Sequence, residues 1–148
     1  MTISPQTGLC LAIGLAATIE DLRRRQIPNW IPLAGLAGGL AWHLWTGGWR
    51  GGLASLGGSV GGFVVFLLFY LLGGMGGGDV KLMAGFGAIL GWSGVLWAAL
   101  WTAAAGGLMA LVVIGWRQLR RKPAGDDSIP YAPAITLGAW LGLVSISV

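Results

Sequence analysis

The sequence predicts an all-α integral membrane protein, a bundle of about six transmembrane helices in a single domain over residues 1–148. Two observations lead to this prediction. Hydrophobic residues make up 55% of the chain and charged residues only 9%, whereas soluble domains average about 25% charged residues. The apolar residues also gather into runs close to the ~20 residues that a helix needs to cross a bilayer. A soluble fold is excluded, because so few polar side chains would not cover its surface.

Six apolar runs, separated by charged or glycine-rich stretches, are the expected crossings. They cover residues 3–19, 30–46, 51–72, 80–92, 95–116 and 131–148. The first run contains Pro5, which suits an opening helical turn, and it ends at the charged residues 20–25. Glycines at 73–78 separate the third run from the fourth, which a tight turn at 91–94 keeps short. Because positive charges follow the first run rather than precede it, we expect a retained helix and no cleaved signal peptide.

The basic residues predict how the bundle is oriented in the membrane. Since alternate loops face opposite sides, eight of the nine basic residues share one side. They are Arg23, Arg24, Arg25, Lys81, Arg117, Arg120, Arg121 and Lys122. Short basic loops stay in the cytoplasm, so we expect a multi-pass protein of the cell inner membrane with both termini outside. Their confinement to loops argues against a nucleic-acid partner, because they form no basic face.

Two carboxylates lie at the cytoplasmic ends of different expected helices. Asp21 follows the first apolar run, and Asp79 precedes the fourth. Taken alone, each aspartate also fits a solvated helix end. Two aspartates that approach closely share one proton, so that one activates water while the other protonates a leaving amine. Such a pair needs no cofactor, and one cysteine with one histidine leaves no zinc cluster to expect.

The residues before Asp79 predict a special backbone. Five of the six residues at 73–78 are glycine. Each glycine in a helix costs about 1 kcal/mol of helix stability relative to alanine. Unwound backbone at membrane depth is tolerated only inside protein or beside a water-filled cavity. The sequence therefore predicts a Gly-rich unwound loop over 73–78 at the active site, where exposed backbone suits pairing with an extended peptide.

Two short segments carry the candidate aspartates. Residues 21–29 read DLRRRQIPN, an aspartate followed after six residues by proline and asparagine, and residues 76–82 read GGGDVKL. Together they resemble the two active-site segments of the type IV prepilin peptidases, the GxGD membrane aspartic proteases. The resemblance spans the whole membrane domain. It implies an aspartic endopeptidase that cleaves the short basic leader of prepilins or pseudopilins at the cytoplasmic face, just before their apolar helix.

The resemblance also implies roles for individual residues. Asp21 and Asp79 match the catalytic pair. The residues of the same segments expected to shape the loop or bind substrate are Pro28, Asn29, Gly76, Gly78 and Lys81. Asn29 is further expected to cap the second helix. Long members of the family carry a cytoplasmic insertion with four zinc-binding cysteines and methylate the new N-terminus. This chain resembles the short form associated with tight-adherence (Flp) or archaeal-type pili, for which no methylation is implied.

Two other classes of function stay open. A small proton-coupled transporter would use Asp21 and Asp79 as relay carboxylates. Transporter sites usually lie near the membrane midplane, often between repeated halves, whereas both aspartates are expected at one edge and the sequence shows no convincing repeat. A scaffold subunit of a secretion machine would leave the glycines at 73–78 unexplained.

Overall fold

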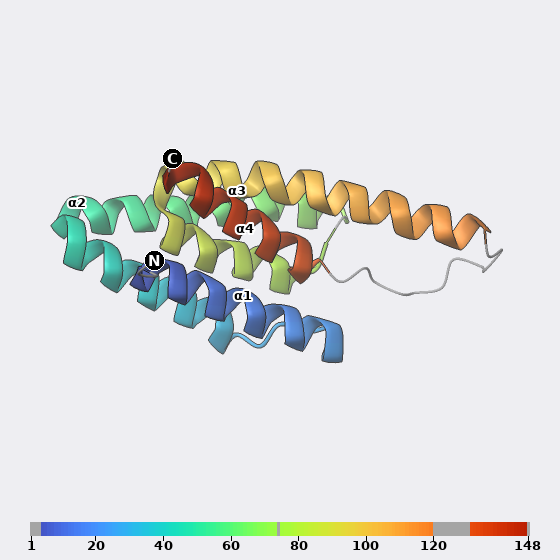
Figure 1. The fold of residues 1–148 in the computed structure, drawn as a ribbon, viewed down its shortest axis with the longest axis horizontal. Coiled ribbons are helices and arrows are strands. Elements are labelled where there is room, and N and C mark those ends of the chain that lie inside the picture. Colours follow the sequence, from blue (N-terminus) through green and yellow to red (C-terminus); the bar gives the residue numbers. More distant parts are fainter. Residues whose placement is uncertain (1–3, 74, 120–130, 148) are drawn as a thin grey trace.

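The computed structural model describes residues 4–73, 75–119 and 131–147, which form four α-helices. They are α1 (Pro5–Arg24), α2 (Trp30–Leu71), α3 (Gly77–Leu119) and α4 (Ala132–Ser147). The described ranges contain no strand, and the helices lie roughly along one long axis (Figure 1). The all-α prediction is therefore confirmed. Both α2 and α3 are long and apolar enough to cross a membrane.

Helix α1 begins at a capped N-terminus and extends beyond the predicted apolar run. Ser4 Oγ accepts the backbone N–H of Thr7 (3.1 Å), and Pro5 occupies the first turn, where its missing N–H costs no helical hydrogen bond. The helix ends at Arg25, whose left-handed backbone (φ 52°) lets its N–H donate to the Asp21 carbonyl (2.8 Å). The predicted run stops at residue 19, so the structure adds the last turn, which carries Asp21.

Each of the two long helices contains one glycine with a non-helical backbone. Gly48 (φ 57°, ψ −147°) lies inside α2, and Gly91 (φ 72°, ψ −175°) lies inside α3. Glycine adopts such positive φ angles readily, whereas other residues are strained there. The chain reverses direction within each helix (Figure 1). Over the described residues the six expected apolar runs thus form four helices, because α2 and α3 each combine two runs as arms on either side of the glycine.

Side chains satisfy the carbonyls that the reversal in α3 leaves without helical partners. The last carbonyls of a helical segment have no donor within the helix. Ser55 Oγ donates to the Ala88 carbonyl (2.8 Å), and Gln6 Nε2 donates to the Ile89 carbonyl (2.7 Å). His43 Nε2 lies 3.0 Å from the same Ile89 oxygen. Polar side chains from α1 and α2 therefore hold this reversal in place.

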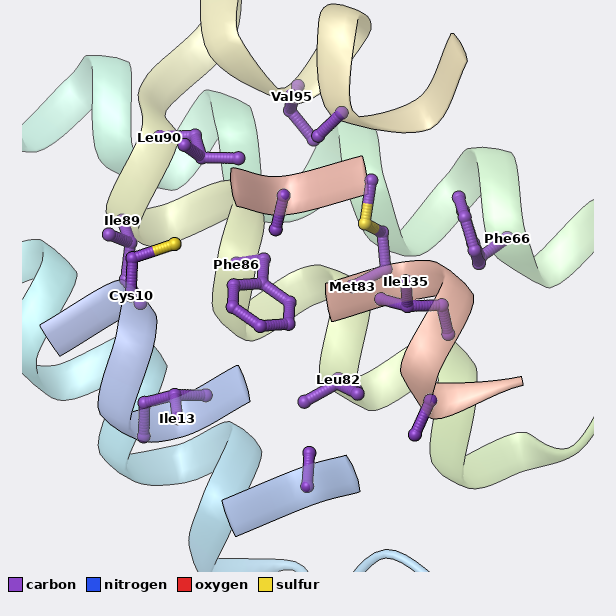
Figure 2. Packing of buried hydrophobic residues seen from close by; sticks show 14 of the residues in the cluster. Cys10, Ile13, Phe66, Leu82, Met83, Phe86, Ile89, Leu90, Val95 and Ile135 are labelled. Carbon is purple, nitrogen blue, oxygen red and sulfur yellow. The ribbon is translucent and has the colours of Figure 1, made fainter. Parts of the chain in front are cut away.

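The hydrophobic core gathers around the first arm of α3, and buried side chains of α1, α2, the second arm of α3 and α4 pack with it. Phe86 of α3 is fully buried near Ile13 of α1 and Ile135 of α4 (Figure 2). Many large apolar side chains face outward instead, and Trp45 and Leu72 are 87% and 82% exposed. Extended exposed apolar surface marks contact with a protein or a membrane. The exterior of this bundle is therefore suited to lipid.

The glycine-rich segment before Asp79 is only partly unwound. Gly73 has a positive φ (76°) and Gly76 precedes α3, but Gly77 and Gly78 form the first turn of that helix. Residue 74 lies outside the described residues. The prediction of an unwound loop over 73–78 is therefore wrong for its last two residues. A side-chain cap from Asp79 to the Gly76 N–H (3.1 Å) stabilises this first turn and offsets the low helix propensity of glycine.

Candidate active site

Three segments meet around one cavity of about 340 Å³. They are the end of α1, the connection from α1 to α2, and the start of α3. The lining residues are Asp21, Arg25, Gln26, Ile27, Asn29, Gly76, Gly77, Gly78, Asp79 and Lys81. The cavity thus unites the two segments, 21–29 and 76–82, that contain the predicted site residues.

Six of the seven predicted site residues line this cavity. They are Asp21, Asn29, Gly76, Gly78, Asp79 and Lys81. The seventh, Pro28, is half-buried and is not among the lining residues. Its carbonyl accepts the N–H of Ile31 (3.1 Å). Pro28 therefore shapes the turn that leads into α2.

Asp79 is held by the backbone at the start of α3. Its side chain is buried, with 7% of the residue exposed, and its Oδ2 accepts the N–H of Gly76 (3.1 Å). The N–H of Asp79 in turn donates to the Gly76 carbonyl (3.1 Å). An acidic residue that reaches back to the N-cap backbone is one half of a capping box. The carboxyl group is thereby fixed at a helix N-terminus, where the helix dipole favours negative charge.

Asp21 is held by the start of a different helix. It is also 7% exposed, and its Oδ2 accepts the N–H of Ala132, the first residue of α4, at 3.0 Å. Burial raises the pKa of the Asp21 carboxyl, while the Ala132 N–H and the charge of Arg25 act to lower it. Asp21 lies in the last turn of α1, after the apolar run predicted at residues 3–19. Both aspartates therefore accept a backbone N–H at the beginning of a helix.

The two carboxyl groups face the same small cavity. Burial disfavours the charged form of each group, and the proximity of a second carboxylate disfavours it further. A pair of this kind favours one shared proton, with one acid and one base. Such an arrangement suits hydrolysis by an activated water molecule. The described residues include no group of three or more His, Cys, Asp or Glu side chains placed to hold a metal ion.

Lys81 and Asn29 form one wall of the cavity. Lys81 Nζ donates to Asn29 Oδ1 at 3.0 Å and so joins α3 to the start of α2. Asn29 occupies the N-cap position of α2, but its side chain makes no capping hydrogen bond. The prediction that Asn29 caps this helix through its side chain is therefore wrong, because the amide oxygen accepts from Lys81 instead.

Gly76 and Gly78 both have an ordinary backbone, and only Gly78 lies in a tightly packed position. Neither has a positive φ. A Cβ atom added at Gly78 would lie 3.3 Å from the Cβ of Ile27, and one added at Gly76 would lie 3.5 Å from Asp79 Oδ2. Glycine at position 78 therefore lets the start of α3 pack closely on the α1–α2 connection, whereas a Cβ atom at position 76 would make an ordinary van der Waals contact with the carboxyl group.

The family model for the type IV leader peptidases matches residues 8–111 of this chain, a range that includes both aspartates. The chain belongs to the type IV leader peptidase family. A prepilin leader peptidase/N-methyltransferase of Aeromonas hydrophila is 32% identical over 155 residues, covering 97% of this chain and 52% of the relative. A relative of the same name in Burkholderia pseudomallei (strain 1026b) is 33% identical over 139 residues, covering 88% of this chain and 43% of the relative.

This member of the leader peptidase family spans about half the length of the curated relatives it matches. No solved structure matches the chain. Family membership together with the apolar helices α2 and α3 indicates an integral membrane protein.

The sequence did not indicate every residue around the cavity of this leader peptidase family member. Arg25, Gln26 and Ile27 line the cavity, whereas the sequence predicts only a cytoplasmic position for Arg25 and no role for Gln26 and Ile27. The role of Ala132 was also missed. Pro133 directly after it is typical of a first helical turn, so the start of a helix is visible in the sequence. Its contact with the end of α1 is not, because a backbone N–H leaves no side-chain pattern.

Proposed function

We propose that this chain is a membrane-embedded aspartic endopeptidase that removes the basic leader peptide from prepilin-like proteins at the cytoplasmic face. The main support is the pair of buried carboxyl groups, Asp21 and Asp79, on one cavity, each fixed by a backbone N–H at a helix start. The substrate class is supported by relatives named prepilin leader peptidase. The proposal covers peptide hydrolysis alone and includes no methylation.

In the proposed reaction the two aspartates share one proton and bind a water molecule between them. The ionised carboxylate takes a proton from water while the water oxygen attacks the peptide carbonyl carbon. The protonated carboxyl donates its proton to the carbonyl oxygen, which gives a neutral tetrahedral intermediate. Collapse of this intermediate breaks the C–N bond. The proton taken from water passes to the leaving amine, and the proton of the intermediate's hydroxyl group restores the original protonation of the pair.

The surroundings of the cavity support a substrate that is polar on one side of the cut and apolar on the other. An open groove of about 330 Å³ adjoins the cavity and shares Asn29 and Lys81 with it. Its remaining lining residues are Pro32, Leu33, Leu36, Phe63, Ala84 and Gly85. The proposed substrate places its leader at the polar cavity and the beginning of its apolar helix in this groove.

The proposed membrane topology has six crossings of the inner membrane, made by α1, the two arms of α2, the two arms of α3, and α4. Residues 23–25 and Lys81 lie at the cavity end, whereas Arg50 lies beside the reversal of α2 at the other end (Figure 1). This distribution supports a cytoplasmic cavity under the positive-inside rule. Arg120, Arg121 and Lys122 lie outside the described residues. A reporter fused after residue 148 should be active outside, and activity in the cytoplasm would contradict this topology.

Co-expression with candidate prepilins tests the function directly. Cleavage of the leader should appear as a shift in gel mobility, and the new N-terminus should begin just before the apolar helix. The alternative, a transporter, predicts unchanged prepilins and proton movement across liposomes that contain the purified chain. An intact prepilin in the presence of correctly inserted protein, for every candidate substrate tried, would contradict the peptidase proposal.

A further inference from the structure

A row of hydrogen bonds joins α1 to α4 along one face of each helix. The donor–acceptor pairs are Ala132 N–H to Asp21 Oδ2 (3.0 Å), Thr18 Oγ1 to Thr136 Oγ1 (3.1 Å), Thr136 Oγ1 to the Gly14 carbonyl (3.2 Å) and Trp140 Nε1 to the Cys10 carbonyl (3.2 Å). The three α4 residues are spaced four apart, so they share one helix face. We call this row of bonds the α1–α4 seam. It begins at the candidate active site and runs away from it.

Close packing along the seam depends on Gly14. A Cβ atom at this position would lie 2.5 Å from Thr136 Cγ2 and 2.9 Å from Trp140 Nε1. Small residues let membrane helices approach closely enough for hydrogen bonds between them. Water does not compete for these groups inside a bilayer. The seam therefore fixes how far α4 is displaced along α1, and with it the position of the α4 N-terminus.

The end of the seam is a contact with a residue of the proposed catalytic pair. The Ala132 N–H belongs to the first turn of α4, where it has no helical carbonyl to bond. It donates instead to Asp21 Oδ2, one helical turn from the Thr136 hydroxyl. Because the donor is backbone, its place depends entirely on where α4 lies. A small shift of α4 would lengthen the bond to Asp21 without changing any residue of the cavity.

We infer that α4 is the positioning element of the active site, in which Thr136 and Trp140 hold the Ala132 N–H against the Asp21 carboxylate. This inference rests on the proposed peptidase function. The N–H stabilises the ionised form of Asp21 and orients its oxygens toward the cavity. The charged groups that share the cavity with Asp21 are Asp79 and Lys81 from α3 and Arg25 at the end of α1. The described part of α4 carries no charged side chain.

Two buried threonines offer a matched test. Thr136 and Thr102 are each 3% exposed, but Thr136 bonds to α1 whereas the hydroxyl of Thr102 has no partner among the described residues. Replacing either by valine removes one hydroxyl at nearly constant volume. Thr136→Val should lower kcat roughly ten- to a hundredfold, as misplacement of a catalytic group does, with KM nearly unchanged. Thr102→Val should leave both constants at wild-type values, and Thr136→Ser should restore kcat.

The pH profile separates positioning from simple loss of structure. A weaker bond from Ala132 raises the proton affinity of Asp21, so one limb of the pH–rate curve should move to higher pH in Thr136→Val. A wild-type kcat and pH profile in this variant would overturn the inference. Equal losses in Thr136→Val and Thr102→Val, in proportion to their melting temperatures, would also overturn it.

An ester at position 132 tests the bond itself if Thr136→Val does not fold. Cell-free synthesis with lactic acid in place of Ala132 replaces the N–H by oxygen and keeps the side chain. The same shift in pH profile is expected, and an unchanged profile would contradict the inference.

Infrared titration of isotope-labelled aspartate measures the protonation of Asp21 without any substrate. The Asp21→Asn variant identifies which infrared band belongs to Asp21. Failure of the wild-type chain to cleave any prepilin would contradict the proposed peptidase function. An Asp21 band that titrates identically in the wild type and in the ester variant would contradict the inference that α4 positions Asp21.

Discussion

Replacing Asp79 separates its structural contribution from its proposed chemistry. Asp79 Oδ2 accepts the Gly76 N–H at the start of α3. Asp79→Asn keeps an oxygen that can accept this bond and loses only the interaction of a charge with the helix dipole, which is worth about 0.3–1 kcal/mol. Removal of a buried charge beside Asp21 acts in the opposite direction. Asp79→Asn should therefore change the free energy of unfolding by less than about 1 kcal/mol, whereas Asp79→Ala removes the acceptor and should cost about 1 kcal/mol.

Activity should not follow this order of stability. Both variants lack a carboxyl group that can exchange protons with water, so both should lose at least about a hundredfold in turnover. Prepilin cleavage on a gel and thermal unfolding in detergent, measured on the same preparation, provide the comparison. An Asp79→Asn variant that keeps more than roughly a tenth of wild-type turnover would refute the proposed roles, because general acid–base groups contribute more than this.

Three further predictions follow from the packing and the cavity. Gly58→Ala would place a Cβ atom 2.6 Å from the carbonyl carbon of Gly91. The variant should therefore lower the free energy of unfolding by about 3 kcal/mol. An unchanged melting temperature would show that α2 and α3 are not packed this closely. Ala84→Phe fills the groove beside the cavity and should raise KM for prepilin. Ala103→Phe fills a separate apolar cavity and should leave KM unchanged. The reverse result would show that substrate binds in that separate cavity. EDTA should leave cleavage unaffected, because the proposed reaction uses carboxyl groups alone, and a loss restored by added zinc or magnesium would contradict this.

The sequence predicts the all-α fold and the apolar stretches of α2 and α3, because a helix that crosses a bilayer needs about 20 mainly apolar residues. The number of helices could not be predicted in the same way. Gly48 and Gly91 reverse the chain through a single positive φ angle, while the neighbouring Gly47 has an ordinary backbone. Nothing in the local sequence distinguishes Gly47 from Gly48 in this respect.

The candidate aspartates were visible for a different reason. A carboxylate that follows five glycines in a chain with so few charges is an energetic anomaly, and Asp79 is the residue that caps the helix beginning there. The partner of Asp21 could not be predicted, because Ala132 lies 111 residues away and donates through its backbone. The side-chain cap expected from Asn29 failed because Lys81, from another helix, offers the amide oxygen a charged donor.

The reversals in α2 and α3 have a practical consequence for labelling and proteolysis. A protease, or an inserted epitope, needs a stretch of backbone that can leave its surroundings without unwinding a helix. At the end of the bundle that holds the cavity, the connection from α1 to α2 and the residues just before α3 offer such stretches. At the opposite end, within the part of the chain that the structure describes, the only crossovers are single glycines inside helices. Limited digestion should therefore cut beside the active site first, and tags that must preserve turnover belong after α4, away from the cavity (Figure 1).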